Sequence, residues 1–220
     1  MQKRNFILLT AILCTVCMML IDGLWQPPYF LKSLLKIAVF GGSLLAYAVL
    51  YHEKPVRFRT SGASLKRTVL LAAGIYALIV GGFFLTRQII DYSHITGTLT
   101  STIGVSKENF LYVSLYISFV NSLLEELFFR GYAYLTLRRY ADPKFCCFLS
   151  AGLFAVYHGG MLYGWFHVGI YLLMLAGLFA AGLLFNALDN KPDAVLPSWL
   201  PHMFANFGIN TAGFILFSIS

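Results

Sequence analysis

Two adjacent glutamates, Glu125 and Glu126, lie inside the apolar stretch 119–130. An ionisable side chain at the centre of a membrane helix costs at least ~2.5 kcal/mol on insertion scales, so such residues usually serve a function. On a helix, Glu126 and Arg130 are four positions apart and share a face, whereas Glu125 is rotated from Glu126 by about 100°. We therefore predict that Glu126 pairs with Arg130 and that Glu125 points elsewhere, toward a cavity. The simpler alternative is that both glutamates are salt-bridged to Arg130.

Two histidines and an asparagine extend this set of polar residues in apolar segments. His158 lies near the end of one apolar stretch, four positions after Phe154. His202 and Asn206 are also four positions apart, which places both on one face of the last predicted helix. A lone histidine in such a segment is often only a hydrogen-bonded core residue. Because these segments hold few polar residues, we interpret the three side chains and Glu125 as one site.

This set of side chains is suited to the hydrolysis of an amide. A buried carboxylate beside an imidazole, here Glu125 and His158, can take a proton from water, and the water then attacks a carbonyl carbon. Donors on His202 and Asn206 can stabilise the oxyanion that forms, and the loss of one such donor typically costs ~100-fold in rate. No serine or cysteine lies in a nucleophile elbow, so we predict a reaction without a covalent nucleophile.

A metal site is the alternative use of the same residues. Two histidines and a carboxylate are also a zinc ligand set. Zinc proteases commonly carry the motif His-Glu-x-x-His, which this sequence lacks. We therefore expect no cofactor, with zinc as the open alternative. The cysteines have no metal-ligand spacing with a histidine and are interpreted as small buried apolar residues: Cys14, Cys17, Cys146 and Cys147.

The composition of the chain indicates a membrane protein. Of its 220 residues, 59% are hydrophobic and 11% are charged, whereas a soluble domain has about 25% charged residues. The mean hydropathy is +0.74. The net charge of +7 comes from lysines and arginines between apolar runs, where such residues set membrane topology. No basic face with interleaved aromatic residues is present, which argues against nucleic-acid binding.

Apolar stretches of nearly membrane-spanning length, about 20 residues each, follow one another along the chain. Backbone polar groups in lipid must be paired within the segment, so we predict helices for all of them. The fold class is therefore all-α, a polytopic transmembrane bundle of about seven helices in a single membrane-embedded domain over 1–220. The predicted helices cover residues 6–25, 30–51, 68–86, 110–130, 145–163, 166–188 and 195–218.

The polar connections predict the orientation of the chain. The first apolar run is too long for a cleaved signal peptide and is followed by further spans, so we interpret it as a transmembrane helix. Basic residues dominate the connections 52–67, which includes Arg57 and Arg59, and 138–144. Both connections lie inside if the N-terminus is cytoplasmic, as the positive-inside rule requires. The 188–198 loop, which includes Asp189, fits this rule less well.

The depths of the candidate residues along their helices differ. Glu125 is ~20 Å along its helix from Arg138, whereas His202 is only ~10 Å into its span, at 1.5 Å per residue. Convergence therefore needs a tilt or a break, and Pro201 allows a bend just before His202. The glycine pair 159–160 permits an early end of the helix that carries His158. We expect a water-filled cavity that opens to the cytoplasmic side.

Three motifs occur in order on successive predicted helices. Together they resemble the signature of the CAAX-protease and bacteriocin-processing membrane family, also called CPBP or Abi, over about residues 118–208. The resemblance implies an all-α glutamate-dependent endopeptidase with a metal-free mechanism, a protease-like core in 110–220 and variable N-terminal spans in 1–109. The motifs are Glu125-Glu126-x-x-x-Arg130, Phe154-x-x-x-His158 and His202-x-x-x-Asn206.

The resemblance also assigns roles to the motif residues. Glu125 and His158 match the residues that activate water, and His202 and Asn206 match an oxyanion hole. Glu126 and Arg130 match supporting positions. The implied partners are membrane lipid and a membrane-associated peptide or protein substrate, and the implied location is a bacterial cell membrane.

Two other functions compete with proteolysis. The first is a non-catalytic membrane protein of the same fold, for example a bacteriocin self-immunity or scaffold protein. The second is a transporter or proton relay, because buried glutamates and histidines also mark ion pathways. Matched halves with broken helices would favour transport, and the sequence shows none.

Overall fold

The computed structural model describes residues 1–55, 62–90 and 92–219, so Arg57 and Arg59 of the first basic connection lie outside the described residues. Within these ranges the regular structure is helical and no strand is present, which confirms the all-α prediction. Six helices in the described part are long and apolar enough to cross a membrane. The protein is therefore an integral multi-pass membrane protein. The segment predicted over 195–218 is also helical, as α10 (Leu196–Ile219), but is not among those six.

By its internal contacts the chain divides into two compact units. The first unit consists of Met1–Thr60 and Leu124–Ser198, and the second of Ser61–Leu123 and Trp199–Ser220. The prediction of one domain over 1–220 stays a prediction. The helices of the first unit are α1 (Lys3–Leu20), η1 (Ile21–Trp25), α2 (Tyr29–Lys36), η2 (Ile37–Gly41), α3 (Gly42–Tyr51), η4 (Glu126–Thr136), η5 (Leu137–Arg139), α8 (Pro143–Leu162) and α9 (Val168–Asn190), where η1, η2 and η4 are π-helical.

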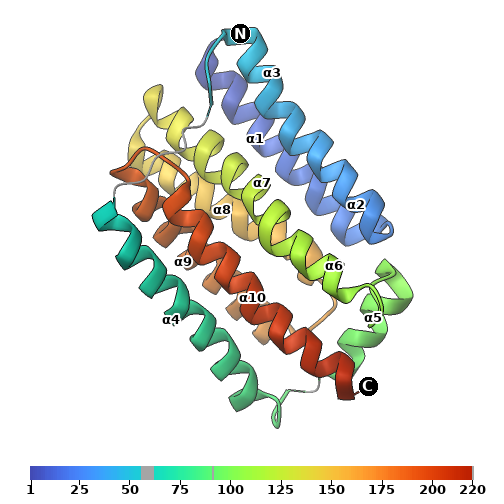
Figure 1. Ribbon diagram of the computed structural model, residues 1–220. Coiled ribbons are helices and arrows are strands. Elements are labelled where there is room, and N and C mark those ends of the chain that lie inside the picture. Colours follow the sequence, from blue (N-terminus) through green and yellow to red (C-terminus); the bar gives the residue numbers. More distant parts are fainter. Residues whose placement is uncertain (56–61, 91, 220) are drawn as a thin grey trace. The chain divides into compact units, whose positions relative to one another are not determined.

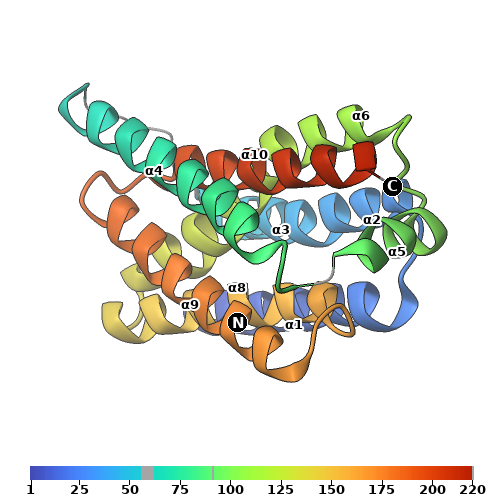
Figure 2. The same ribbon diagram turned by 90° about the horizontal axis from the view of Figure 1, so that it is seen from below.

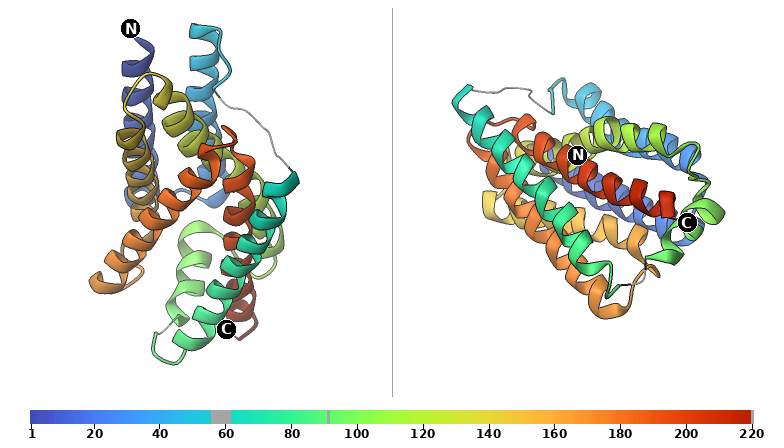
Figure 3. Two further views of the ribbon diagram at one scale, coloured as in Figure 1. Left: turned by 90° about the vertical axis from the view of Figure 1, so that its left-hand side faces the viewer. Right: turned by 60° about the horizontal axis from the view of Figure 1, so that its bottom comes forward.

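The second unit places α10 beside the helices that precede the glutamate pair in sequence. Tyr76 of α4 and Thr211 of α10 are joined by a hydrogen bond of 3.2 Å between their hydroxyl oxygens, and Figure 3 shows α4 and α10 alongside each other. The amide of Asn210 donates to the backbone oxygen of Ser114 at 3.1 Å. The remaining helices are α4 (Gly62–Thr86), α5 (Ser93–Ile103), α6 (Phe110–Leu115) and η3 (Tyr116–Asn121), and α7 (Ser122–Glu125) continues the chain into the first unit.

The first two spans form a hairpin with a sharp turn. Gln26 ends η1 in the left-handed region, with φ of 49°. Pro27 and Pro28 follow and cannot donate backbone hydrogen bonds, so the helix does not continue and α2 begins at Tyr29. As Figure 1 shows, α2 and α3 return beside α1. The hairpin thereby brings the polar residues of η1 and α2 together.

Side chains at the open end of this hairpin converge on Glu53. The carboxylate of Glu53 accepts hydrogen bonds from Lys3, from Tyr140 at 2.8 Å and from Tyr47 at 2.8 Å. These bonds, with the one from Lys3 first among them, lower the pKa of Glu53 from 4.5 to about 2. The start of α1, the end of α3 and the residue after η5 are thus joined at one carboxylate.

Helix α8 is the centre of the first unit. Asp142 caps its N-terminus by accepting a hydrogen bond of 2.8 Å from the backbone N–H of Phe145, and Pro143 occupies the first turn. Helices α1, α9 and η4 all pack against α8, and Figure 2 shows α1 and α8 side by side. This packing fixes the helix that carries His158.

The glycine pair that could have ended α8 has a different role. The helix continues through Gly159 and Gly160 to Leu162. A Cβ atom on Gly160 would overlap the backbone oxygen of Met19 and lie 3.0 Å from the Met19 Cα. Gly160 therefore allows the backbones of α1 and α8 to approach closely.

We expect Gly160→Ala to destabilise the protein by ~1–3 kcal/mol, because the added methyl group meets backbone rather than a mobile side chain. Gly152 of the same helix is the matched control, since a Cβ there has nothing within 4 Å. Gly152→Ala should be neutral or slightly stabilising, because alanine favours the helix. Unfolding of both variants in mixed micelles measures the difference. Equal stability would contradict the close contact between α1 and α8.

Large apolar side chains are exposed on the spans of both units. In a soluble protein such exposure would be costly, whereas in a bilayer these side chains contact lipid. This exposure agrees with the assignment of the helices as membrane spans. Strongly exposed examples are Leu45 at 66%, Leu78 at 74%, Leu85 at 79% and Leu173 at 72%.

Candidate functional site

Glu125 lies at the end of α7, where the helix widens into the π-helical η4. Such π-helical turns are frequent at functional sites. The residue is 1% exposed, and its two carboxylate oxygens have different neighbours. Oε1 accepts hydrogen bonds of 3.1 Å from the Lys36 Nζ and 3.1 Å from the Tyr157 hydroxyl. Oε2 faces the Nε2 of His158 at 3.7 Å.

The ring of His158 is oriented by its own helix. Its Nδ1 lies 2.9 Å from the backbone oxygen of Phe154, one turn earlier in α8. A carbonyl oxygen can only accept, so Nδ1 carries the hydrogen in this bond. In the neutral ring, Nε2 therefore presents its lone pair to Oε2 of Glu125. Oε2 of Glu125 and Nε2 of His158 are then both hydrogen-bond acceptors, 3.7 Å apart. A molecule with two hydrogens to donate, such as water, fits between them and donates one to each.

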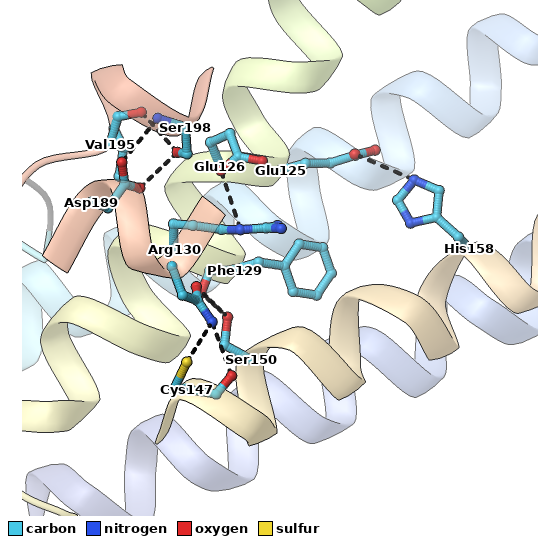
Figure 4. Close-up of polar contacts among 11 residues, drawn as sticks. Glu125, Glu126, Phe129, Arg130, Cys147, Ser150, His158, Asp189, Val195 and Ser198 are labelled. Carbon is cyan, nitrogen blue, oxygen red and sulfur yellow. Dashed lines mark hydrogen bonds and ion pairs between the residues drawn. The ribbon is translucent and has the colours of Figure 1, made fainter. Parts of the chain in front are cut away.

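The second glutamate of the pair points in another direction. Glu126 Oε2 lies 3.3 Å from Arg130 Nε, and both side chains are fully buried. The Arg130 guanidinium also lies over the Phe154 ring at 4.1 Å and the Phe185 ring at 5.1 Å. Figure 4 shows Glu126 directed to Arg130 and Glu125 directed to His158. The predicted Glu126–Arg130 pair is therefore present, and Glu125 forms its ion pair with Lys36 rather than with Arg130.

Asp189 corrects the assignment of residues 188–198 to a polar loop. It belongs to α9 and is fully buried. Its carboxylate accepts hydrogen bonds of 2.9 Å from the backbone N–H and 2.6 Å from the hydroxyl of Ser198. These bonds replace water and make the burial tolerable. Figure 4 shows this contact at the opposite side of the view from His158. Because Ser198 lies in the first turn of α10, Asp189 fixes that turn.

Sequence reasoning missed several residues of the first unit. Lys36 and Tyr157 both contact Glu125, and Asp22 pairs with Lys32 at 3.0 Å in a second buried ion pair. Glu125 and Glu126 are thus not the only acids inside the spans. A signal was present, because Lys32 and Lys36 are four positions apart in the otherwise apolar stretch 30–51, where each carries a large insertion cost.

The other two predicted site residues lie in the second unit. His202 is 5% exposed. The amide nitrogen of Asn206 donates a hydrogen bond of 3.2 Å to the backbone oxygen of Ile117, which leaves its second hydrogen for another acceptor. Asn210, missed by the sequence reasoning, lies one turn further on and donates to Ser118 Oγ at 3.0 Å. The convergence of His202 and Asn206 with Glu125 stays a prediction.

Among the residues that the structure describes, no three or more His, Cys, Asp or Glu side chains form a group that could hold a metal ion. The metal-free mechanism itself stays a prediction.

The fold and the site define an all-α, multi-pass membrane protein with a buried carboxylate–imidazole pair. Residues 107–208 match the family model described as type II CAAX prenyl endopeptidase Rce1-like. This match confirms the predicted resemblance over that segment and supports a CAAX-type intramembrane protease fold. The matched range includes all six predicted site residues. No curated protein and no solved structure matches the chain.

Proposed function

We propose that the protein is an intramembrane endopeptidase that hydrolyses a peptide bond of a membrane-associated peptide or protein. The observation that carries the proposal is the approach of Glu125 Oε2 to His158 Nε2, 3.7 Å apart, at a carboxylate buried within a membrane span. The match of residues 107–208 to a protease family supports it. Glu126 and Arg130 have a supporting role in this proposal, because they hold the helix on which Glu125 lies.

The proposed reaction uses water as the nucleophile. A water that donates one hydrogen to Glu125 and the other to His158 turns its lone pairs toward the substrate carbonyl. Glu125 takes a proton as the C–O bond forms, and this proton passes to the amine nitrogen as the C–N bond breaks. In the same proposal, His202 and Asn206 donate hydrogen bonds to the oxyanion. The second amide hydrogen of Asn206 is suited to this role.

The substrate class that we propose is broader than the prenylated proteins that the family description indicates. That description names a CAAX prenyl endopeptidase, whereas the carboxylate–imidazole pair selects for a peptide bond rather than for a lipid group. We therefore propose membrane-associated peptides or proteins in general, in a bacterial cell membrane with the N-terminus cytoplasmic. Bacteriocin-linked processing falls within this proposal, whereas a self-immunity protein is the non-catalytic alternative.

The purified protein in lipid nanodiscs, incubated with a library of fluorescence-quenched peptides with and without a prenyl group, tests the proposal. We expect cleavage by the wild type, a loss of ~100-fold or more in His158→Ala, and no effect of a metal chelator. Cleavage that is equal in wild type and His158→Ala would refute the mechanism. Cleavage abolished by the chelator would favour the zinc alternative. No cleavage above buffer would favour a non-catalytic protein of the same fold.

A further inference from the structure

Lys36 contacts the candidate catalytic glutamate from outside the segment that matches the family. The family match begins at residue 107, whereas Lys36 is the last residue of α2. Its Nζ lies 3.1 Å from Glu125 Oε1 and 4.9 Å from the centre of the Tyr157 ring. The residue is 6% exposed. A lysine buried to this degree inside a membrane span lowers stability unless its charge is paired with an opposite charge.

We propose that Lys36 is a positioning residue for Glu125: its ammonium keeps the Glu125 carboxylate ionised inside the membrane span and directs Oε2 to His158. The catalytic consequence rests on the proposed function, whereas the electrostatic role does not. In this proposal the N-terminal spans contribute a residue, Lys36, to the site itself.

The geometry gives Lys36 two effects on the carboxylate. Burial disfavours an ionised carboxylate, and an opposite charge within about 4–6 Å favours it. Lys36 at 3.1 Å provides that charge. Lys36 and Tyr157 also both donate to Oε1, which fixes the rotation of the carboxylate. Oε2 is then the oxygen that faces His158.

The other charged and titratable groups near Glu125 do not replace Lys36. Arg130 is paired with Glu126, and Lys32 is paired with Asp22. Each of these cations therefore forms its ion pair with another carboxylate, and Arg130 adds only a smaller electrostatic interaction with Glu125. In the described part of the chain, the charged and titratable groups around Glu125 include Lys36 from α2, Tyr157 and His158 from α8, and Glu126 and Arg130 from its own span. Asp22 and Lys32 form the adjacent pair of the hairpin, and Tyr29 interacts electrostatically with Tyr157.

Lys32 offers a matched control for Lys36. It lies one helical turn earlier in α2, is also buried, and forms its ion pair with Asp22 rather than with Glu125. Lys32→Met and Lys36→Met remove the same charge from the same helix. A purely structural role of the buried lysines predicts similar effects of the two substitutions, whereas the proposal predicts that only Lys36→Met changes the behaviour of Glu125.

The first test compares pH profiles of kcat/KM for a cleaved quenched peptide. In Lys36→Met we expect a fall of at least ~10-fold at pH 7 and an acidic limb displaced to higher pH by about one unit or more, because a nearby cation no longer favours the ionised carboxylate. Lys36→Arg should restore most of the activity and the position of the limb. Lys32→Met should leave the limb where the wild type has it. An unmoved limb in Lys36→Met would overturn the proposal.

The second test needs no substrate. Infrared titration follows protonation of Glu125 directly, through the carboxylate band that is lost in Glu125→Gln. This band should disappear at a higher pH in Lys36→Met than in the wild type and in Lys32→Met. If the Glu125 band moves to higher pH in Lys36→Met but the wild type cleaves no peptide, the role of Lys36 is supported and the proposed function is refuted. If the wild type cleaves peptide but the band does not move in Lys36→Met, the proposed function is supported and the role of Lys36 is refuted. If Lys36→Met does not fold, Lys36→Gln takes its place in this test, because it also removes the charge; a band that does not move to higher pH in that variant would overturn the proposal.

Discussion

The Glu125→Gln variant should lose peptide cleavage by ~10³-fold or more in kcat/KM, measured at pH 7 with the peptide that the wild type cleaves. Glutamine has nearly the same shape as glutamate, so the substitution removes the base and leaves the volume of the site unchanged. General base catalysis contributes 10²–10⁴-fold. The carboxylate of Glu125 also takes part in orienting the water beside His158, at a separation of 3.7 Å, so the loss should lie toward the upper end of that range.

A loss of activity must be separated from a loss of fold. Glu125→Gln leaves the ammonium of Lys36 buried beside a neutral amide, which destabilises the protein. The double variant Lys36→Met/Glu125→Gln removes both charges and should recover stability. It should remain as inactive as the single variant. Cleavage within tenfold of the wild type in either variant would exclude Glu125 as the catalytic base.

Glu125 and His158, which contact each other in the structure, were both predicted as site residues from the sequence alone. Both were found because polar side chains in membrane spans are costly, and the spacing of Glu126 and Arg130 indicated which glutamate was already paired. The structure places Glu126 on Arg130 and Glu125 beside His158. The catalytic roles themselves are still predictions.

Lys36 was not predicted because its partner lies 89 positions away in the sequence. Helical periodicity relates residues within a few turns, and it gives no information on which distant helix lies opposite. The π-helical segment that begins at Glu126 adds to this difficulty, since it changes the angle between successive side chains. Lys32 and Lys36 could be recognised as costly, but their carboxylate partners could not be assigned.

Asp189 shows a second limit of the sequence. The charge of Asp189 and its position near the end of an apolar run indicated a loop. In the structure Asp189 is fully buried, and its carboxylate accepts hydrogen bonds from Ser198. The partner is nine positions away, across the turn between α9 and α10, and no helical spacing links the two. Asn206 shows the same limit, because its hydrogen bond to the Ile117 backbone gives it a packing role beside the proposed catalytic one.

Breaking the Glu126–Arg130 pair should have the largest effect on stability. Arg130 is fully buried, with its guanidinium beside Glu126 and over two aromatic rings. Arg130→Met fills similar volume but leaves the carboxylate of Glu126 buried without its cation. We expect a loss of about 3–5 kcal/mol in the free energy of unfolding, the usual cost of breaking a buried ion pair from one side. Glu126→Gln should cost a similar amount, because it leaves the arginine uncompensated.

The double variant Glu126→Gln/Arg130→Met distinguishes a coupled pair from two independent contributions. If the two charges depend on each other, the double variant should be more stable than the sum of the single effects predicts, because neither partner is left behind as a buried charge without the other. Unfolding in mixed micelles measures all four proteins of this cycle. Additive losses would show that Arg130 stabilises the span through the rings of Phe154 and Phe185 rather than through Glu126. A coupled pair would instead mean that the Glu126–Arg130 ion pair itself stabilises the span on which Glu125 lies.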